Sequence, residues 1–261
     1  MLVLCFVLTA NAQTRETRNV GSFTKLSFKA PGKVYLRQGS QQKVEIEGKR
    51  DILNKIETKV EGSKLVIEPE DDRWRWSKGD EITVYVTMTD IEAVSVGGSG
   101  NLIGETTIKG DDINLSVSGS GNMKIKVEAS GDLESDVSGS GNIELDGRCK
   151  TFNSDVSGSG KVVAAIISEG KADFGVSGSG KIEAQGSART VKTSISGSGK
   201  VMAADLETNS CDITITGSGD VEINVKNELN ANIVGSGNVR YRGNPSKVHS
   251  NSAGSGSVKK L

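Results

Sequence analysis

The chain has 261 residues, of which 34% are hydrophobic and only 4% aromatic, and its formal net charge is −1. This neutral balance argues against nucleic-acid binding, which normally depends on a basic surface, so no nucleic-acid partner is predicted. Few aromatic residues and 33 glycines favour a thin fold filled by small aliphatic side chains over a thick globular core.

Residues 1–12 (MLVLCFVLTANA) form an apolar run that ends in Ala10-Asn11-Ala12, the A-x-A pattern of a signal-peptidase site. We interpret them as a signal peptide; the alternative is a buried N-terminal strand. No basic residue precedes Arg15, so the leader is either truncated at its start or atypical. Twelve residues are too few to span a bilayer, so no transmembrane segment is predicted beyond the leader. The expected location is the periplasm, the outer-membrane surface or the medium.

Residues 13–19 are polar and are predicted to be disordered. Residues 20–97 contain short apolar runs with strand character and a weak helical signal at 51–56. We expect this region to be an N-terminal β region that caps one end of the structure that follows. It is either a separate sandwich or a set of wider coils of the same structure. Continuity is favoured, because the run 91–96 leads into the first repeat without a break.

Residues 68–81 (EPEDDRWRWSKGDE) interrupt these strands and hold both tryptophans of the chain. Trp74 and Trp76 alternate with Arg73 and Arg75. Exposed Trp and Arg side chains are favoured anchors in binding surfaces, so these four residues are a candidate ligand-binding site. The alternative is a hairpin whose rings pack back onto the cap.

A Gly-Ser-Gly motif recurs nine times at intervals of 18 to 21 residues. The motif begins at Gly98, Gly119, Gly139, Gly158, Gly178, Gly197, Gly217, Gly235 and Gly254. A period near 20 indicates a stacked array in which each unit buries its apolar face against its neighbours. We therefore assign residues 98–261 to one repeat domain.

The residues around each motif predict two strands and a tight corner. The second residue after Gly-Ser-Gly is apolar in all nine copies, and the second residue before it is apolar in eight, with Ser252 as the exception. This spacing has the period of a β-strand, and glycine permits the positive φ of a tight turn. With a looser second corner near Ser130-Gly131, Glu169-Gly170 and Gly186-Ser187, each copy makes one coil of a parallel β-helix. The crossover rule predicts a right-handed helix.

The residue after each motif forms a column along the edge of the array. Asn101, Asn122 and Asn142 are expected to hydrogen-bond to one another as a stacked ladder. Lys161, Lys181 and Lys200 follow on adjacent coils. They are either a stripe that attracts an anionic glycan or phosphate, or simply a solvated edge.

Residues for catalysis are scarce. His249 is the only histidine, so neither a histidine-based metal cluster nor a Ser-His triad can be built, and the motif serines do not match a nucleophile elbow. We therefore predict no enzyme activity, no catalytic residue, no metal and no cofactor.

Cys149 and Cys211 lie about three coils apart, roughly 14 Å at the strand spacing. We expect two free thiols, because a disulfide needs a much shorter separation.

The repeated Val-Ser-Gly-Ser-Gly-Asn/Lys unit, the leader ending Ala10-Asn11-Ala12-Gln13 and the opening 19–23 (NVGSF) together resemble one known family. It is the putative auto-transporter adhesin, head GIN domain family of the Bacteroidetes, and the resemblance covers about residues 18–258. It implies a two-sheeted β-helix similar to pectin-lyase-like folds without their catalytic residues, and an adhesin role.

Two hypotheses on function follow. The first is an exported, non-catalytic binding module that recognises a cell-surface glycan or protein. The second is a structural envelope protein whose repeats only hold a shape or self-associate, for example as a homo-oligomer, without a specific ligand.

Overall fold

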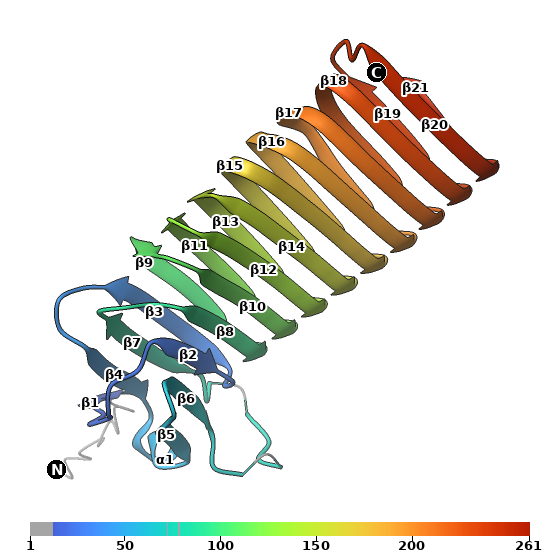
Figure 1. Cartoon of the computed structure of the whole chain (residues 1–261). Helices are drawn as coiled ribbons and strands as arrows, with labels where there is room; N and C mark the ends of the chain where they lie inside the picture. The colour runs from blue at the N-terminus through green and yellow to red at the C-terminus, as the bar shows by residue number, and fades with distance from the viewer. Residues whose placement is uncertain (1–12, 72, 78) are drawn as a thin grey trace, which may run out of the picture.

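The computed structural model describes residues 13–71, 73–77 and 79–261. The signal-peptide interpretation of residues 1–12 lies outside this range. The described chain is a β-solenoid whose coils stack along one axis, with the N-terminal region at one end and the C-terminus at the other (Figure 1). The all-β, parallel β-helical architecture expected from the repeats is therefore confirmed.

Each repeat contributes one strand before the glycine corner and one strand after it. We call the two resulting sheets the pre-corner sheet and the post-corner sheet. The pre-corner sheet contains β8 (Ala93–Gly98), β10 (Ile113–Gly119), β12 (Asp132–Gly139), β14 (Thr151–Gly158) and β20 (Lys247–Gly254). The post-corner sheet contains β9 (Asn101–Gly110), β11 (Asn122–Ala129), β13 (Asn142–Cys149), β19 (Asn238–Arg242) and β21 (Ser257–Lys260).

Four longer strands run through the second corner and belong to both sheets. They are β15 (Lys161–Gly178), β16 (Lys181–Gly197), β17 (Lys200–Gly217) and β18 (Asp220–Gly235). Throughout the array the strands are parallel and equivalent motif positions face each other, so that Val137 pairs with Val156 and Val156 with Val176. This common register is what the constant phase of the repeats predicted.

The core is a narrow aliphatic layer between the two sheets. Positions two before and two after each corner are buried from the first coil to the coil of β18. The last coil differs: Val248 is 41% exposed and Val258 is half-buried. No further described strand covers this coil, so its inward side chains lie open to solvent.

The two glycines of each corner have different physical roles. The first has positive φ in all nine copies, for example +112° at Gly158. The second has no room for a side chain: a Cβ on Gly199 would lie 2.3 Å from Cγ1 of Val176 and 2.9 Å from the carbonyl oxygen of Gly180. Corners of adjacent coils are also hydrogen-bonded, with the Ser159 amide donating to the Gly139 oxygen at 2.8 Å.

The N-terminal region extends both sheets. Strand β2 (Lys25–Phe28) lies between β8 and β6 (Lys64–Pro69) and is parallel to both. Strand β3 (Gly32–Gln38) likewise lies between β9 and β7 (Ile82–Met88). These pairings support the expectation of wider coils that continue the solenoid.

Antiparallel elements then close this end of the stack. Strand β4 (Lys43–Gly48) pairs with β7, β1 (Thr14–Thr17) pairs with β4, and β5 (Ile56–Glu61) pairs with β6. The one-turn helix α1 (Arg50–Leu53) adds two buried side chains and begins one residue before the expected helical signal. The prediction that residues 13–19 are disordered is wrong, because β1 completes the edge of β4 through backbone pairing that polar residues can make.

Both cysteines in the described chain, Cys149 and Cys211, are free, as expected from their separation along the stack, and both are buried. Burial raises the pKa of the Cys149 thiol to about 11. This thiol is therefore protonated at neutral pH and is a weak nucleophile.

Candidate functional site

The described residues between β6 and β7, which are 70–71, 73–77 and 79–81, occupy a corner of the solenoid, and we call them the tryptophan loop. It joins β6 to β7, and these strands extend the pre-corner and post-corner sheets respectively. The loop thus replaces a Gly-Ser-Gly corner on the outermost of the wider coils. Figure 1 shows it projecting at the N-terminal end of the edge along which the glycine corners lie.

The loop brings its two indole rings together. The ring centroids of Trp74 and Trp76 are 4.3 Å apart with an interplanar angle of 33°, and the ammonium of Lys55 lies 5.0 Å from the Trp74 centroid. Both rings are half-buried and pack partly against the core. The rings therefore lie between the two arrangements that the sequence left open, full exposure and packing onto the cap.

The two arginines of the loop are exposed on either side of Trp74. The Arg73 side chain bonds Asp71 through Nε at 3.3 Å. A paired aromatic surface beside guanidinium groups can stack on a sugar ring or anchor a protein partner. The structure thus places all four predicted loop residues in one cluster.

The predicted lysine column does not join this cluster. Lys161 lies on the fifth coil beyond β7, roughly 24 Å away at the strand spacing. The ammonium groups of Lys161 and Lys181 bond Glu183 at 2.8 and 2.6 Å, and Lys200 bonds Asp220 at 3.2 Å. The two lysines hold the pKa of Glu183 below its usual range. These carboxylates reduce the positive field of the column.

The asparagine ladder is confirmed. Asn122 donates from Nδ2 to Oδ1 of Asn101 at 2.8 Å, and Asn142 donates in the same way to Asn122 at 2.8 Å. These bonds satisfy side chains within the stack, so the ladder has a structural role on this edge.

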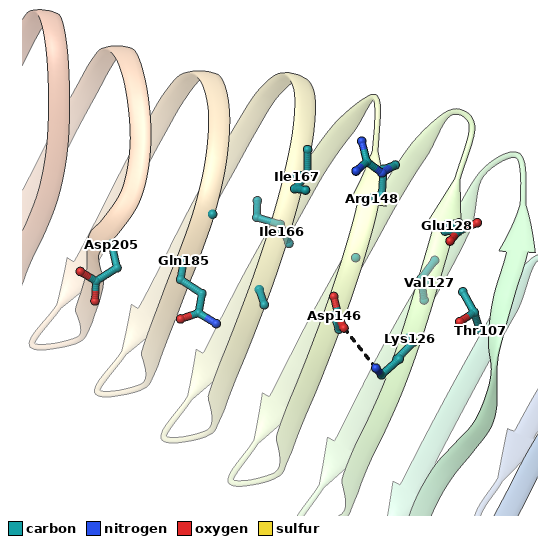
Figure 2. A pocket seen from close by; sticks show the side chains of 13 residues that line it. Thr107, Lys126, Val127, Glu128, Asp146, Arg148, Ile166, Ile167, Gln185 and Asp205 are labelled. Carbon is teal, nitrogen blue, oxygen red and sulfur yellow. Dashed lines mark ion pairs between the residues drawn. The ribbon is translucent and has the colours of Figure 1, made fainter.

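A groove on the post-corner sheet was not predicted. It has a volume of about 530 Å³ and runs across the coils from β9 to β17. Figure 2 shows Lys126, Asp146, Gln185 and Asp205 along one side and Arg148 and Ile167 along the other. Gly147 and Gly186 lie between the two rows, in register with Ile166. The sequence signal was the run 162–167 (VVAAII), which is apolar at outward as well as inward positions.

A pair of stacked aspartates lies on the outer face of the pre-corner sheet. Asp136 and Asp155 face each other on adjacent coils, and the Asp155 carboxylate lies over Gly175, where a Cβ would be 1.9 Å from its Oδ1. Partial burial and neighbouring carboxylates raise the pKa of both groups. The folded chain therefore holds these protons more tightly than the unfolded chain does.

Replacing Asp155 with Asn is expected to stabilise the fold at pH 7, since it removes a charge that burial and its neighbours disfavour. Unfavourable like-charge pairs on a sheet cost about 0.2–1 kcal/mol, so we expect a melting temperature about 1–3 °C higher. A raised folded-state pKa makes wild-type stability improve as the pH falls, so the gain should vanish near pH 3.5, where the unfolded-state carboxyl is largely protonated. Asp146→Asn is the matched control, because Asp146 is bonded to Lys126 at 3.5 Å and should gain nothing. Equal gains for both variants would contradict this interpretation.

Within the described residues, no group of three or more His, Cys, Asp and Glu side chains is arranged to hold a metal ion. No helix in the same residues is long and apolar enough to cross a membrane.

Comparison with family models decides the family. The model described as "Putative auto-transporter adhesin, head GIN domain" matches residues 22–180 and 162–245. The chain belongs to this family. Comparison with curated proteins gives no significant match.

Solved structures show the same fold as this head GIN domain chain. A putative lipid binding protein from Parabacteroides distasonis has a TM-score of 0.72 at 21% identity, over 95% of this chain and 96% of that one. A putative adhesin from Parabacteroides merdae has a TM-score of 0.71 at 21% identity, with the same coverage. A putative adhesin from Bacteroides fragilis has a TM-score of 0.55 at 20% identity, over 97% and 98%. At these identities the likeness concerns the fold.

Proposed function

We propose that the protein is an exported, non-catalytic binding module that attaches to a cell-surface glycan or protein through the tryptophan loop. The observation that carries the proposal is the cluster of two indole rings and two exposed arginines at one end of a stiff solenoid. A rod of this kind holds its terminal loop away from the rest of the body. Membership of an adhesin-type family supports an exported or surface role.

The expected free energies of contact favour the tryptophan loop over the polar columns as the binding anchor. A buried Trp or Arg contact in an interface is worth about 2 kcal/mol or more, whereas exposed ion pairs are worth about 0–1 kcal/mol. The lysine column is already paired with Glu183 and Asp220, so a ligand there would have to displace these carboxylates. Among the described residues, the contact of Arg73 with Asp71 is the ion pair that a ligand at the loop arginines would have to displace.

Replacing Arg73 and Arg75 together with Gln is expected to weaken attachment at least tenfold while leaving the melting temperature nearly unchanged, because both side chains are exposed. Trp74→Ala with Trp76→Ala should abolish attachment, and should also lower the melting temperature by several degrees, because the rings are half-buried against the core. Binding is measured on a glycan array and on intact cells, with melting followed by circular dichroism.

Lys161→Gln with Lys181→Gln is the matched control and should leave binding within twofold of wild type. Loss of attachment in this control, with the arginine variant unaffected, would move the site to the lysine column. Absence of attachment in the wild-type protein would favour the structural, self-associating role instead.

A further inference from the structure

Strand β15 presents an apolar strip on the outer face of the post-corner sheet. Val163 is 36% exposed and Ile167 is 43% exposed, and Ala165 lies between them on the same face. The neighbouring strands are polar at the equivalent positions, with Glu144, Asp146 and Arg148 on β13 and Glu183, Gln185 and Ser187 on β16. The strip is therefore an isolated apolar surface between two polar coils.

Two adjoining grooves meet at this strip. Ile167 lines the first groove, of about 530 Å³, and Val163 lines the second, of about 550 Å³. Both grooves share Ala165, Gln185, Asp146 and Lys126. Their volumes lie within the range of about 300–1,000 Å³ that is usual for small-ligand sites. A small or slender ligand thus fits this surface.

One cationic side chain in the first groove, Arg148, is not bonded to a carboxylate of the described residues. Each carboxylate that lines it has a cation from the chain: Asp146 bonds Lys126 at 3.5 Å, Glu128 bonds Lys109 at 2.9 Å and Asp205 bonds Arg242 at 3.0 Å. Among the described residues, the Arg148 guanidinium has no carboxylate within ion-pair distance. Its register neighbour Glu128 bonds Lys109 instead, and both Lys109 and, more weakly, the charge of Arg148 lower the pKa of Glu128. Arg148 is also the register neighbour of Ile167, so a free cation adjoins the apolar strip.

We propose that this surface binds an unbranched fatty carboxylate. The carboxylate bonds the Arg148 guanidinium, which suits a planar two-oxygen anion. The hydrocarbon chain then lies along β15 over Ile167, Ala165 and Val163, a distance of about 13 Å at the rise of a strand. That length accommodates roughly ten carbons. The inference stands apart from the tryptophan loop, which lies on another part of the molecule.

The test is a calorimetric titration of the purified protein with dodecanoate below its micelle concentration. Wild-type protein should show saturable binding with about one site, and acetate, which lacks the chain, should show none. Arg148→Gln should weaken dodecanoate binding at least tenfold, as should Val163→Ser combined with Ile167→Ser. All three positions are exposed, so these variants should melt close to wild type.

Two variants elsewhere serve as matched controls. Val234 is a somewhat more exposed valine than Val163, 48% accessible, on the pre-corner part of β18, and Lys192 is an exposed cation on the pre-corner part of β16. Val234→Ser and Lys192→Gln should bind dodecanoate within twofold of wild type. The proposal is overturned if the wild type shows no saturable binding, if the controls lose as much affinity as the groove variants, or if Arg148→Gln binds normally.

Discussion

Replacing Gly158 with Ala is expected to cost about 3 kcal/mol or more of stability, because two effects act together. Gly158 has φ of +112°, where a side chain is strained by about 1–3 kcal/mol. A Cβ there would also lie 2.6 Å from the carbonyl oxygen of Gly139 on the preceding coil. That oxygen accepts the Ser159 amide at 2.8 Å, so the coils cannot separate without lengthening this hydrogen bond.

Two control variants separate the strain from the collision. Gly62 has φ of +62°, but a Cβ added there would meet no atom within 4 Å, so Gly62→Ala should cost only about 1–2 kcal/mol. Ser159→Ala changes an exposed corner residue and should lie within about 0.5 kcal/mol of wild type. Thermal and urea unfolding followed by circular dichroism measures all three. Similar losses at Gly158 and Gly62 would show that contact between corners contributes little.

The repeat array could be predicted because the neighbours of each residue in space are the equivalent residues of the adjacent repeats. Each coil pairs with the next copy of itself, so the inward positions follow from the strand period and the constant spacing of the motif. The same reasoning predicted the asparagine ladder from Asn101, Asn122 and Asn142 alone. Even the lysine pairing could have been found, since Glu183 is two residues after Lys181 on the same face of a strand.

The N-terminal end could not be predicted in the same way, because its order in space differs from its order in the chain. Strand β2 lies between β6 and β8, although β6 follows it by more than thirty residues. No periodicity encodes such an insertion. The pairing of β1 with β4 is similarly non-local, which is why a polar segment that lacks a strand pattern was expected to be disordered.

The candidate sites, too, could be predicted from the sequence only in part. Composition identified the tryptophan loop, but only the structure shows that its rings contact each other and lie half-buried against the core. The groove depends on which outward residues of neighbouring coils stand beside Gly147 and Gly186, and this requires the register of six strands. The sequence could not show that the Arg148 guanidinium has no bonded carboxylate among the described residues, because the partners of the surrounding carboxylates come from other coils.

Replacing Val176 with Asp should be the most damaging single change in the middle of the array. Val176 is 3% exposed and pairs with Val156 and Ile195 on the coils to either side. An uncompensated buried charge costs about 3–5 kcal/mol, and part of this should be recovered at low pH as the carboxylate is protonated. Because stability in a solenoid depends on contacts between neighbouring coils, the damage should divide the stack into two less cooperative halves.

Ser177→Asp is the matched control for Val176→Asp, because Ser177 is the next residue on the same strand and faces solvent. The same charge placed there should cost less than about 0.5 kcal/mol. Thermal melts at pH 7 and pH 4 distinguish the two positions: only the Val176 variant should melt much earlier at pH 7 and regain stability at pH 4. Equal melting temperatures for the two variants would mean that the inward and outward faces of β15 are wrongly assigned, and the outward strip of Val163 and Ile167, on the same strand, would lose its basis as well.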